Sequence, residues 1–187
     1  MGHKRILGKT TDFITGREIT DTDDERYRQK LARFLVEVKG YEKDDVLPKR
    51  RIEMEIEGRR ALSMVDFVVS VSGRPFMVIK YGPGSLVTRE RPALAAARIM
   101  AGCEAPLTVV TNGEDAEVLD TVSGALLSTG IDSIPGRPAA EEMVRKTAGR
   151  PPLSAKQIEA EKRILSAYDY LEHDLECDAD WCEPGAE

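Results

Sequence analysis

The chain has 187 residues, of which 41% are hydrophobic and 32% are charged, and its formal net charge is −6. This length and aliphatic content fit one domain with a core of ordinary size, and they exclude a wholly disordered chain. No stretch reaches the ~20 apolar residues of a membrane helix, and the polar, basic start is unlike a secretory signal. Three cysteines at irregular spacing favour a reducing compartment. We therefore expect a cytoplasmic protein without a membrane partner.

The first predicted element is an amphipathic helix from about Asp23 to Val38. Apolar side chains recur there at helical spacing, and acidic residues occupy the first turn, where they oppose the positive end of the helix dipole. Gly40 follows at a position where helices commonly end.

Three strands are predicted next. Residues from Arg51 to Glu57 alternate between apolar and charged, which is typical of a strand with one buried face. Leu62 to Val71 is apolar on both faces except at Asp66, and Pro75 to Tyr81 follows a Ser-Gly turn. The last two strands are therefore predicted to form a hairpin.

An Ala-rich helix is predicted from Thr88 to Gly102, followed by a short apolar strand from Leu107 to Thr111. A strand, helix, strand succession predicts a right-handed crossover and a partly parallel sheet. The segments Glu117 to Thr121 and Ala125 to Ser128 are predicted to form a small hairpin. The expected fold is α/β or α+β, with a mixed central β-sheet flanked by helices.

The C-terminal third predicts a linker, a helical arm and an acidic tail. A short helix is expected from Pro138 to Thr147, and a long amphipathic helix from Ser154 to about Leu175, opened by a capping box with Gln157. The apolar face of the long helix is a candidate surface for a homodimer. The division predicted from the sequence is an N-terminal segment (1–22), a globular domain (23–134), a Pro/Gly-rich linker (135–153), a C-terminal helix (154–176) and an acidic tail (177–187).

The negative charge belongs to the tail. From Glu172 onward there are seven acidic and no basic residues, so 27 basic residues face 26 acidic ones in the rest of the chain. The net charge therefore does not exclude a nucleic-acid partner, and an acidic tail could shield a basic groove.

Asp66 and Lys80 are the charged residues that break the two apolar strands. A carboxylate in an apolar strand is costly unless it is paired, hydrogen-bonded or bound to a metal. The two residues face each other only if the turn holds an odd number of residues, whereas a two-residue turn would point them to opposite faces.

The order of these elements resembles the N-terminal nuclease domain of the R subunit of type I restriction enzymes, which has the PD-(D/E)xK nuclease fold. The resemblance covers roughly Asp12 to Ser128. The residues that carry it are Glu25-Arg26-Tyr27-Arg28-Gln29, Gly40-Tyr41, Val65-Asp66-Phe67-Val68-Val69, Arg74-Pro75-Phe76-Met77-Val78-Ile79 and Val110-Thr111-Asn112-Gly113. The sequence carries no helicase or translocase region, so we expect a single-domain relative.

The resemblance implies a degenerate active site. It makes Asp66 the metal-binding aspartate and Glu25 the glutamate of the first helix. The strand after Asp66 should then end in Glu-x-Lys, but this chain has Lys80-Tyr81-Gly82 there. A glutamine and a tyrosine that the family often carries on the next helix fall near Ala95 and Ile99.

We therefore expect no metal site and no cofactor, since Asp66 alone is a poor site for Mg²⁺. The ammonium of Lys80 is predicted to take the place of the cation and to pair with Asp66. In the alternative, the protein is an active metal-dependent endonuclease, with Mg²⁺ as its cofactor. Lys80 would then be a migrated catalytic lysine, and Glu53 or Glu55 the second carboxylate. The simpler interpretation of these glutamates is the wet face of an edge strand.

A glycine-flanked turn leads into the Arg-bearing helix and combines backbone N–H groups with positive charge, which suits a phosphate. The candidate DNA- or RNA-binding residues are Lys80, Ser85, Arg89, Arg91 and Arg98. A solvated helix face beside a tight loop explains the same pattern equally well. The required Gly-Lys-Ser/Thr ending of a P-loop is absent.

His173, Cys177 and Cys182 lie close together near the C-terminus. They match no zinc-site spacing and lack a fourth local ligand, so ordinary tail residues are expected. The function predicted from the sequence is a restriction-endonuclease-like domain without catalysis that binds nucleic acid. The alternatives are the active nuclease and a structural module that dimerises through its C-terminal helix.

Overall fold

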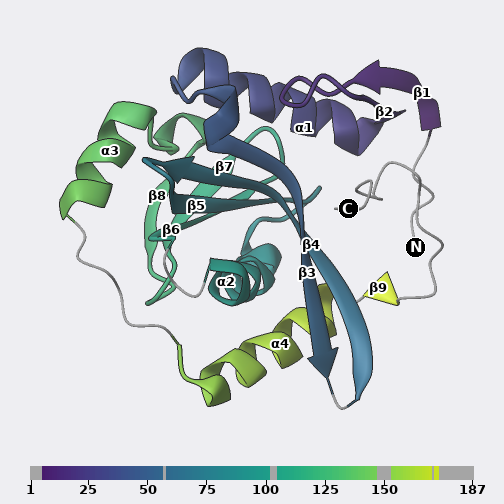
Figure 1. Ribbon diagram of the computed structural model, residues 1–187, viewed down its shortest axis with the longest axis vertical. Coiled ribbons are helices and arrows are strands. Elements are labelled where there is room, and N and C mark those ends of the chain that lie inside the picture. Colours follow the sequence, from purple (N-terminus) through teal and green to yellow (C-terminus); the bar gives the residue numbers. More distant parts are fainter. Residues whose placement is uncertain (1–5, 57, 102–104, 147–152, 170, 173–187) are drawn as a thin grey trace.

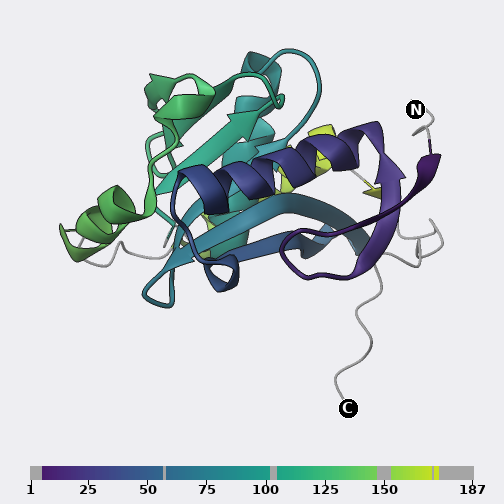
Figure 2. The same ribbon diagram turned by 90° about the horizontal axis from the view of Figure 1, so that it is seen from above.

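The computed structural model describes residues 6–56, 58–101, 105–146, 153–169 and 171–172 (Figure 1). They form three layers, in which a twisted sheet lies between α1 on one face and α2 with α4 on the other (Figures 1 and 2). The α+β class and the mixed sheet flanked by helices are thereby confirmed. The helices are α1 (Asp23–Arg33), α2 (Val87–Ala101), α3 (Arg137–Lys146) and α4 (Ala155–Asp169). The strands are β1 (Ile6–Thr11), β2 (Glu18–Thr22), β3 (Val46–Ile56), β4 (Arg59–Val71), β5 (Arg74–Tyr81), β6 (Leu107–Thr111), β7 (Ala116–Asp120), β8 (Leu126–Thr129) and β9 (Leu171–Glu172).

The central sheet has the strand order β3-β4-β5-β6-β7-β8, and β9 also pairs with β4. Strands β5 and β6 are parallel and are joined by α2, as the strand, helix, strand succession predicted. The other pairings within this sheet are antiparallel. β1 and β2 form a separate antiparallel hairpin within the predicted N-terminal segment.

The hairpin of β4 and β5 contains an irregularity that decides which residues are opposite each other. Its two-residue turn, Ser72–Gly73, has positive φ at both positions, which is the geometry of a type I′ turn. The register then shifts by one residue, so that Phe67 pairs with Ile79. The backbone pairing ends at Phe67 and Ile79, one residue short of Asp66 and Lys80. The shift changes which residues of the two strands are opposite each other beyond Ser70.

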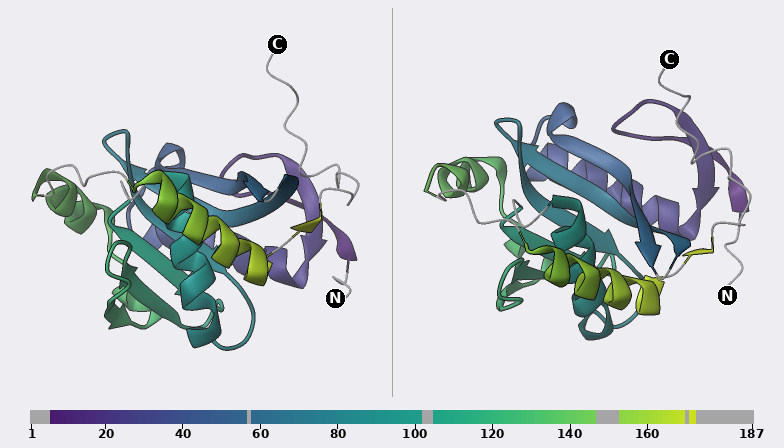
Figure 3. Two further views of the ribbon diagram at one scale, coloured as in Figure 1. Left: turned by 90° about the horizontal axis from the view of Figure 1, so that it is seen from below. Right: turned by 60° about the horizontal axis from the view of Figure 1, so that its bottom comes forward.

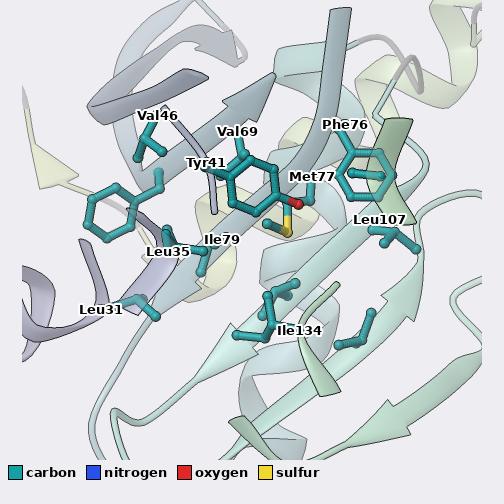
Figure 4. Close-up of a cluster of buried hydrophobic side chains, with 14 of the residues drawn as sticks. Leu31, Leu35, Tyr41, Val46, Val69, Phe76, Met77, Ile79, Leu107 and Ile134 are labelled. Carbon is teal, nitrogen blue, oxygen red and sulfur yellow. The ribbon is translucent and has the colours of Figure 1, made fainter. Parts of the chain in front are cut away.

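The core on the α1 side contains the largest buried side chains (Figure 4). Leu31 of α1 and Leu35 of the helical turn that follows it belong to this cluster, together with Phe76, Met77 and other residues of the sheet. The helical spacing of the α1 residues gives this face, and the helix continues as a π-helical turn over Phe34–Val38.

The opposite face of the sheet is covered by α2 and α4, which lie side by side (Figure 3). Three consecutive alanines of α2 (Ala95–Ala97) are fully buried and allow close approach to the sheet, and Leu165 of α4 is also fully buried. The long C-terminal helix is shorter than predicted, since it ends at Asp169 and Leu171–Glu172 form β9. Pairing with the exposed side of β4 competes with continued helix at this point. The rest of the predicted arm and the acidic tail lie outside the described residues.

Candidate functional site

Asp66 lies in the middle of β4 and is only 3% exposed. Its two carboxylate oxygens are both occupied. Oδ1 accepts a hydrogen bond from Arg28 Nε at 2.5 Å, and Oδ2 accepts one from the backbone N–H of Tyr81 at 2.6 Å. Charge-assisted bonds of this kind satisfy a buried carboxylate that would otherwise be costly.

Glu25 lies in the first turn of α1. Thr22 is the N-cap of this helix, and its hydroxyl oxygen accepts a hydrogen bond from the backbone N–H of Glu25. The Glu25 side chain is buried, and its Oε2 lies 3.5 Å from Arg28 Nη1 and 3.0 Å from Lys49 Nζ. Arg28 therefore contacts both carboxylates that the resemblance assigned to the metal site, Glu25 at one end of its guanidinium and Asp66 at the other.

The position of Lys49 follows from its backbone. It has a φ of 50°, which is unusual for a residue other than glycine, and it lies between the paired residues Pro48 and Arg50 of β3. This local distortion coincides with the ion pair between its ammonium and Glu25. We name the four residues Glu25, Arg28, Lys49 and Asp66 the ion-pair cluster. It holds two positive and two negative charges and is therefore neutral as a whole.

The carboxylates of the cluster act on the pKa of Arg28. Burial lowers this pKa, but the charges of Asp66 and Glu25 and the hydrogen bond to Asp66 outweigh burial, so the pKa of Arg28 is raised above its ordinary value. The guanidinium therefore stays charged.

Further hydrogen bonds connect the cluster to the N-terminal segment. Gln29 Nε2 donates to Glu25 Oε1 at 2.9 Å and to Asp12 Oδ2 at 2.7 Å. Burial raises the pKa of Asp12, but hydrogen bonds from Thr15 and Gln29 outweigh burial and hold it below the ordinary value. Gln29 Oε1 in turn accepts from the backbone N–H of Phe13.

Lys80 donates from Nζ to the backbone carbonyl of Met64 at 2.8 Å. Sequence reasoning assigned the cation beside Asp66 to Lys80, whereas the ion pair that the structure gives Asp66 comes from Arg28. The next residue, Tyr81, stacks on Tyr27 of α1 with ring centroids 5.7 Å apart. Burial raises the pKa of Tyr81 to about 12, with a further contribution from the nearby charge of Asp24.

The arginines of α2 are engaged within the fold. Arg91 and Arg98 both pair with Glu161 of α4, at 2.6 Å and 2.7 Å, and Glu161 is 7% exposed. Arg98 also donates to the backbone carbonyls of the turn after β7. Arg89 lies over Gly82 and donates to the Pro83 carbonyl at 3.0 Å.

The structure brings some predicted residues together and keeps others apart. Glu25 and Asp66 meet through Arg28, and Ser85 lies exposed in the turn before α2. Glu53 is exposed and lies opposite Leu62, four residues along β4 from Asp66 or about 13 Å. Glu55 lies two residues farther along β3, so the carboxylates considered for a rearranged site do not converge on Asp66.

The residues of the cluster do not fit the Mg²⁺ that the nuclease fold implies. Both carboxylates are already bonded by cations, and the Glu-x-Lys positions hold Lys80 and Gly82. Within the described residues, no group of three or more His, Cys, Asp or Glu side chains is placed to hold a metal ion. His173, Cys177 and Cys182 lie outside the described residues.

Sequence reasoning missed Arg28, Gln29, Lys49 and Asp12 as partners of this site. A signal was present for the first two, because both stand within the string that begins with Glu25 and face the same side of a helix at i+3 and i+4. Nothing comparable marked Lys49 or Asp12, because their contacts depend on how β3 and the N-terminal hairpin lie against α1.

One of three comparisons with known proteins gives a match. No helix of the described part of the chain is long and apolar enough to cross a membrane. No curated protein and no solved structure matches the chain. The family model described as Type I restriction enzyme R protein N terminus (HSDR_N) matches residues 23–135, which run from the start of α1 to just before α3. The chain therefore belongs to the family of the type I restriction enzyme R protein N terminus.

Proposed function

We propose that this protein is a restriction-endonuclease-like domain that binds nucleic acid and does not cleave it. One observation carries the absence of cleavage: the guanidinium of Arg28 lies between Glu25 and Asp66, where the nuclease fold would use carboxylates for a metal. Phosphodiester cleavage by this fold needs a hard cation clamped by such carboxylates. A bound guanidinium supplies charge compensation but no activated water.

Displacing Arg28 to admit a metal is costly. Its side chain is 11% exposed, so the guanidinium would lose its partners without gaining full solvation. Separating one partner of a buried ion pair typically costs about 3–5 kcal/mol. Mg²⁺ would also meet the positive charge of Lys49 beside Glu25.

Nucleic-acid binding is supported by family membership and by the near-neutral body that carries the acidic tail. The α2 arginines give this proposal less support than the sequence suggested, since Arg91 and Arg98 both pair with Glu161, which compensates one of their two charges. Dimerisation through the C-terminal helix stays a prediction. Leu165 of that helix is buried within the chain, and Tyr168 is its exposed large side chain.

The test is a nicking assay on supercoiled plasmid with Mg²⁺ or Mn²⁺, with the Glu25→Gln protein as the matched control. We expect both proteins to leave the plasmid intact to the same extent. Metal-dependent nicking by the wild-type protein that Glu25→Gln and Asp66→Asn both abolish would overturn the proposal in favour of an active nuclease. Binding is measured separately, by fluorescence anisotropy of a labelled DNA 20-mer without metal.

A further inference from the structure

A groove lined by three cations lies between the β1–β2 hairpin and α1. Figure 2 shows the hairpin beside this helix. The volume of the groove is about 440 Å³. The residues that line it are Thr10, Asp21, Arg26, Gln29, Lys30 and Arg33. Three cations therefore face one carboxylate. Most of the hairpin wall lies before residue 23, outside the segment that the family model matches.

The carboxylate in the groove neutralises only one of the three cations. Arg26 binds Asp21 through two nitrogens, with Nε at 2.9 Å and Nη2 at 2.7 Å from its oxygens. This contact raises the pKa of Arg26 and lowers that of Asp21. The groove therefore keeps the charges of Lys30 and Arg33.

Lys30 is exposed and makes no ion pair within the part of the chain that the structure describes. Arg33 lies over the ring of Phe13 at 4.3 Å, which fixes one side of its guanidinium and leaves the other open. Its contact with Glu37 is 3.6 Å between two side chains that are each more than half exposed, and such a pair is weak in water. Both cations are thus available to an anion.

Gln29, which lines the groove, is held by three hydrogen bonds. It donates to Asp12 and Glu25 and accepts from Phe13, so that it ties α1 to the N-terminal segment and to the ion-pair cluster. An anion entering the groove would meet preset positive charge without reorganising the backbone around it.

The spacing of the cations suits a chain of phosphates. Lys30 and Arg33, the two cations that Asp21 leaves uncompensated, lie three residues apart on one side of α1, or about 4.5 Å along the helix. One strand of a duplex advances about 3.4 Å along its axis per phosphate. The two cations therefore match two neighbouring phosphates of one strand.

We propose that the groove of Lys30 and Arg33 binds the sugar-phosphate backbone of one nucleic-acid strand. The inference rests on the proposed nucleic-acid binding and names the surface for it, on α1 and the hairpin rather than on α2. Guanidinium and ammonium groups neutralise phosphates without reading bases, so the binding is independent of sequence and falls with salt.

The test compares the full chain with the double variant Lys30→Gln/Arg33→Gln, which keeps polar side chains and removes both charges. The matched control is Arg74→Gln/Lys156→Gln, which removes two exposed cations elsewhere. Anisotropy of a labelled single-stranded DNA 20-mer is followed from 50 to 200 mM salt, and thermal melting confirms that all three proteins fold.

We expect the groove variant to bind about tenfold more weakly, with the slope of log affinity against log salt reduced by about 1.4, while the control keeps the wild-type slope. If the groove variant binds DNA as tightly as the wild-type protein, the groove is not the binding surface, and the proposed function still stands. No binding by the wild-type protein even at 50 mM salt would overturn both. An equal loss in the control variant would show diffuse attraction and would also overturn the groove.

Discussion

Replacing Arg28 by methionine tests the ion-pair cluster most sharply, because methionine keeps the apolar stem and removes the charge. Asp66 would keep its bond from the Tyr81 N–H but lose its charged partner at a site only 3% exposed. Glu25 would still have Lys49. The loss should therefore fall at the lower end for a broken buried pair, about 3 kcal/mol.

For a chain of this length, a loss of that size lowers the melting temperature by about 6–12 °C. Calorimetry at neutral pH and urea unfolding measure it independently. The matched control is Arg26→Met on the same helix. The Arg26 side chain, which pairs with Asp21, is largely exposed, so we expect this variant to have the melting temperature of the wild-type protein. An Arg28→Met protein as stable as the Arg26→Met protein would refute the claim that the guanidinium compensates two buried carboxylates.

Three further predictions follow from other contacts. The pKa of Asp12 is lower in the folded protein than in the unfolded chain. Its charged form therefore stabilises the fold at pH values above the ordinary aspartate pKa, and this stabilisation is lost as the pH falls through the pKa of the folded state. The stability difference between wild type and Asp12→Asn should therefore shrink from pH 6 to pH 3 in urea titrations, and a constant difference would contradict this. Glu161→Gln should cost about 2 kcal/mol and speed amide exchange in α4, because two arginines of α2 lose their common anion, whereas Glu159→Gln, which alters an exposed pair, should do neither. Tyr41→Phe should cost about 1 kcal/mol in urea unfolding, because the hydroxyl donates to the Pro135 carbonyl at 2.9 Å, and unchanged stability would show that this bond contributes nothing.

Much of the fold could be predicted because its elements are local patterns. The alternation of β3, the apolar run of β4, the Ser72–Gly73 turn and the Ala-rich α2 each identify their own structure from a few neighbouring residues. The parallel pairing of β5 and β6 followed from the helix between them. The end of α4 was not predictable in this way, since it depends on pairing with a strand far away in sequence.

The candidate site was predictable in its carboxylates but not in its cations. Asp66 stood out because a charge in an apolar strand needs a partner, and Glu25 followed from the resemblance. The choice of Lys80 as that partner rested on the resemblance, which places Lys80 where the second carboxylate is expected, whereas Arg28 reaches Asp66 from another layer of the fold. A long guanidinium can bridge layers in ways that the spacing along one strand does not reveal.

The α2 arginines also have partners that the sequence pattern did not reveal. From the sequence they formed a basic helix face, but two of them pair with Glu161, on a helix outside the segment matched by the family model. Whether a cation is available to a ligand depends on which acidic side chain the tertiary fold brings beside it.

The most direct test of the central claim is a calorimetric titration of the wild-type protein with Mn²⁺ and Mg²⁺. With Arg28 between Glu25 and Asp66, we predict no binding at millimolar metal and no change in melting temperature. Stoichiometric binding of either ion that Glu25→Gln and Asp66→Asn each abolish would contradict the account, because it would show that the carboxylates serve a metal and not the guanidinium.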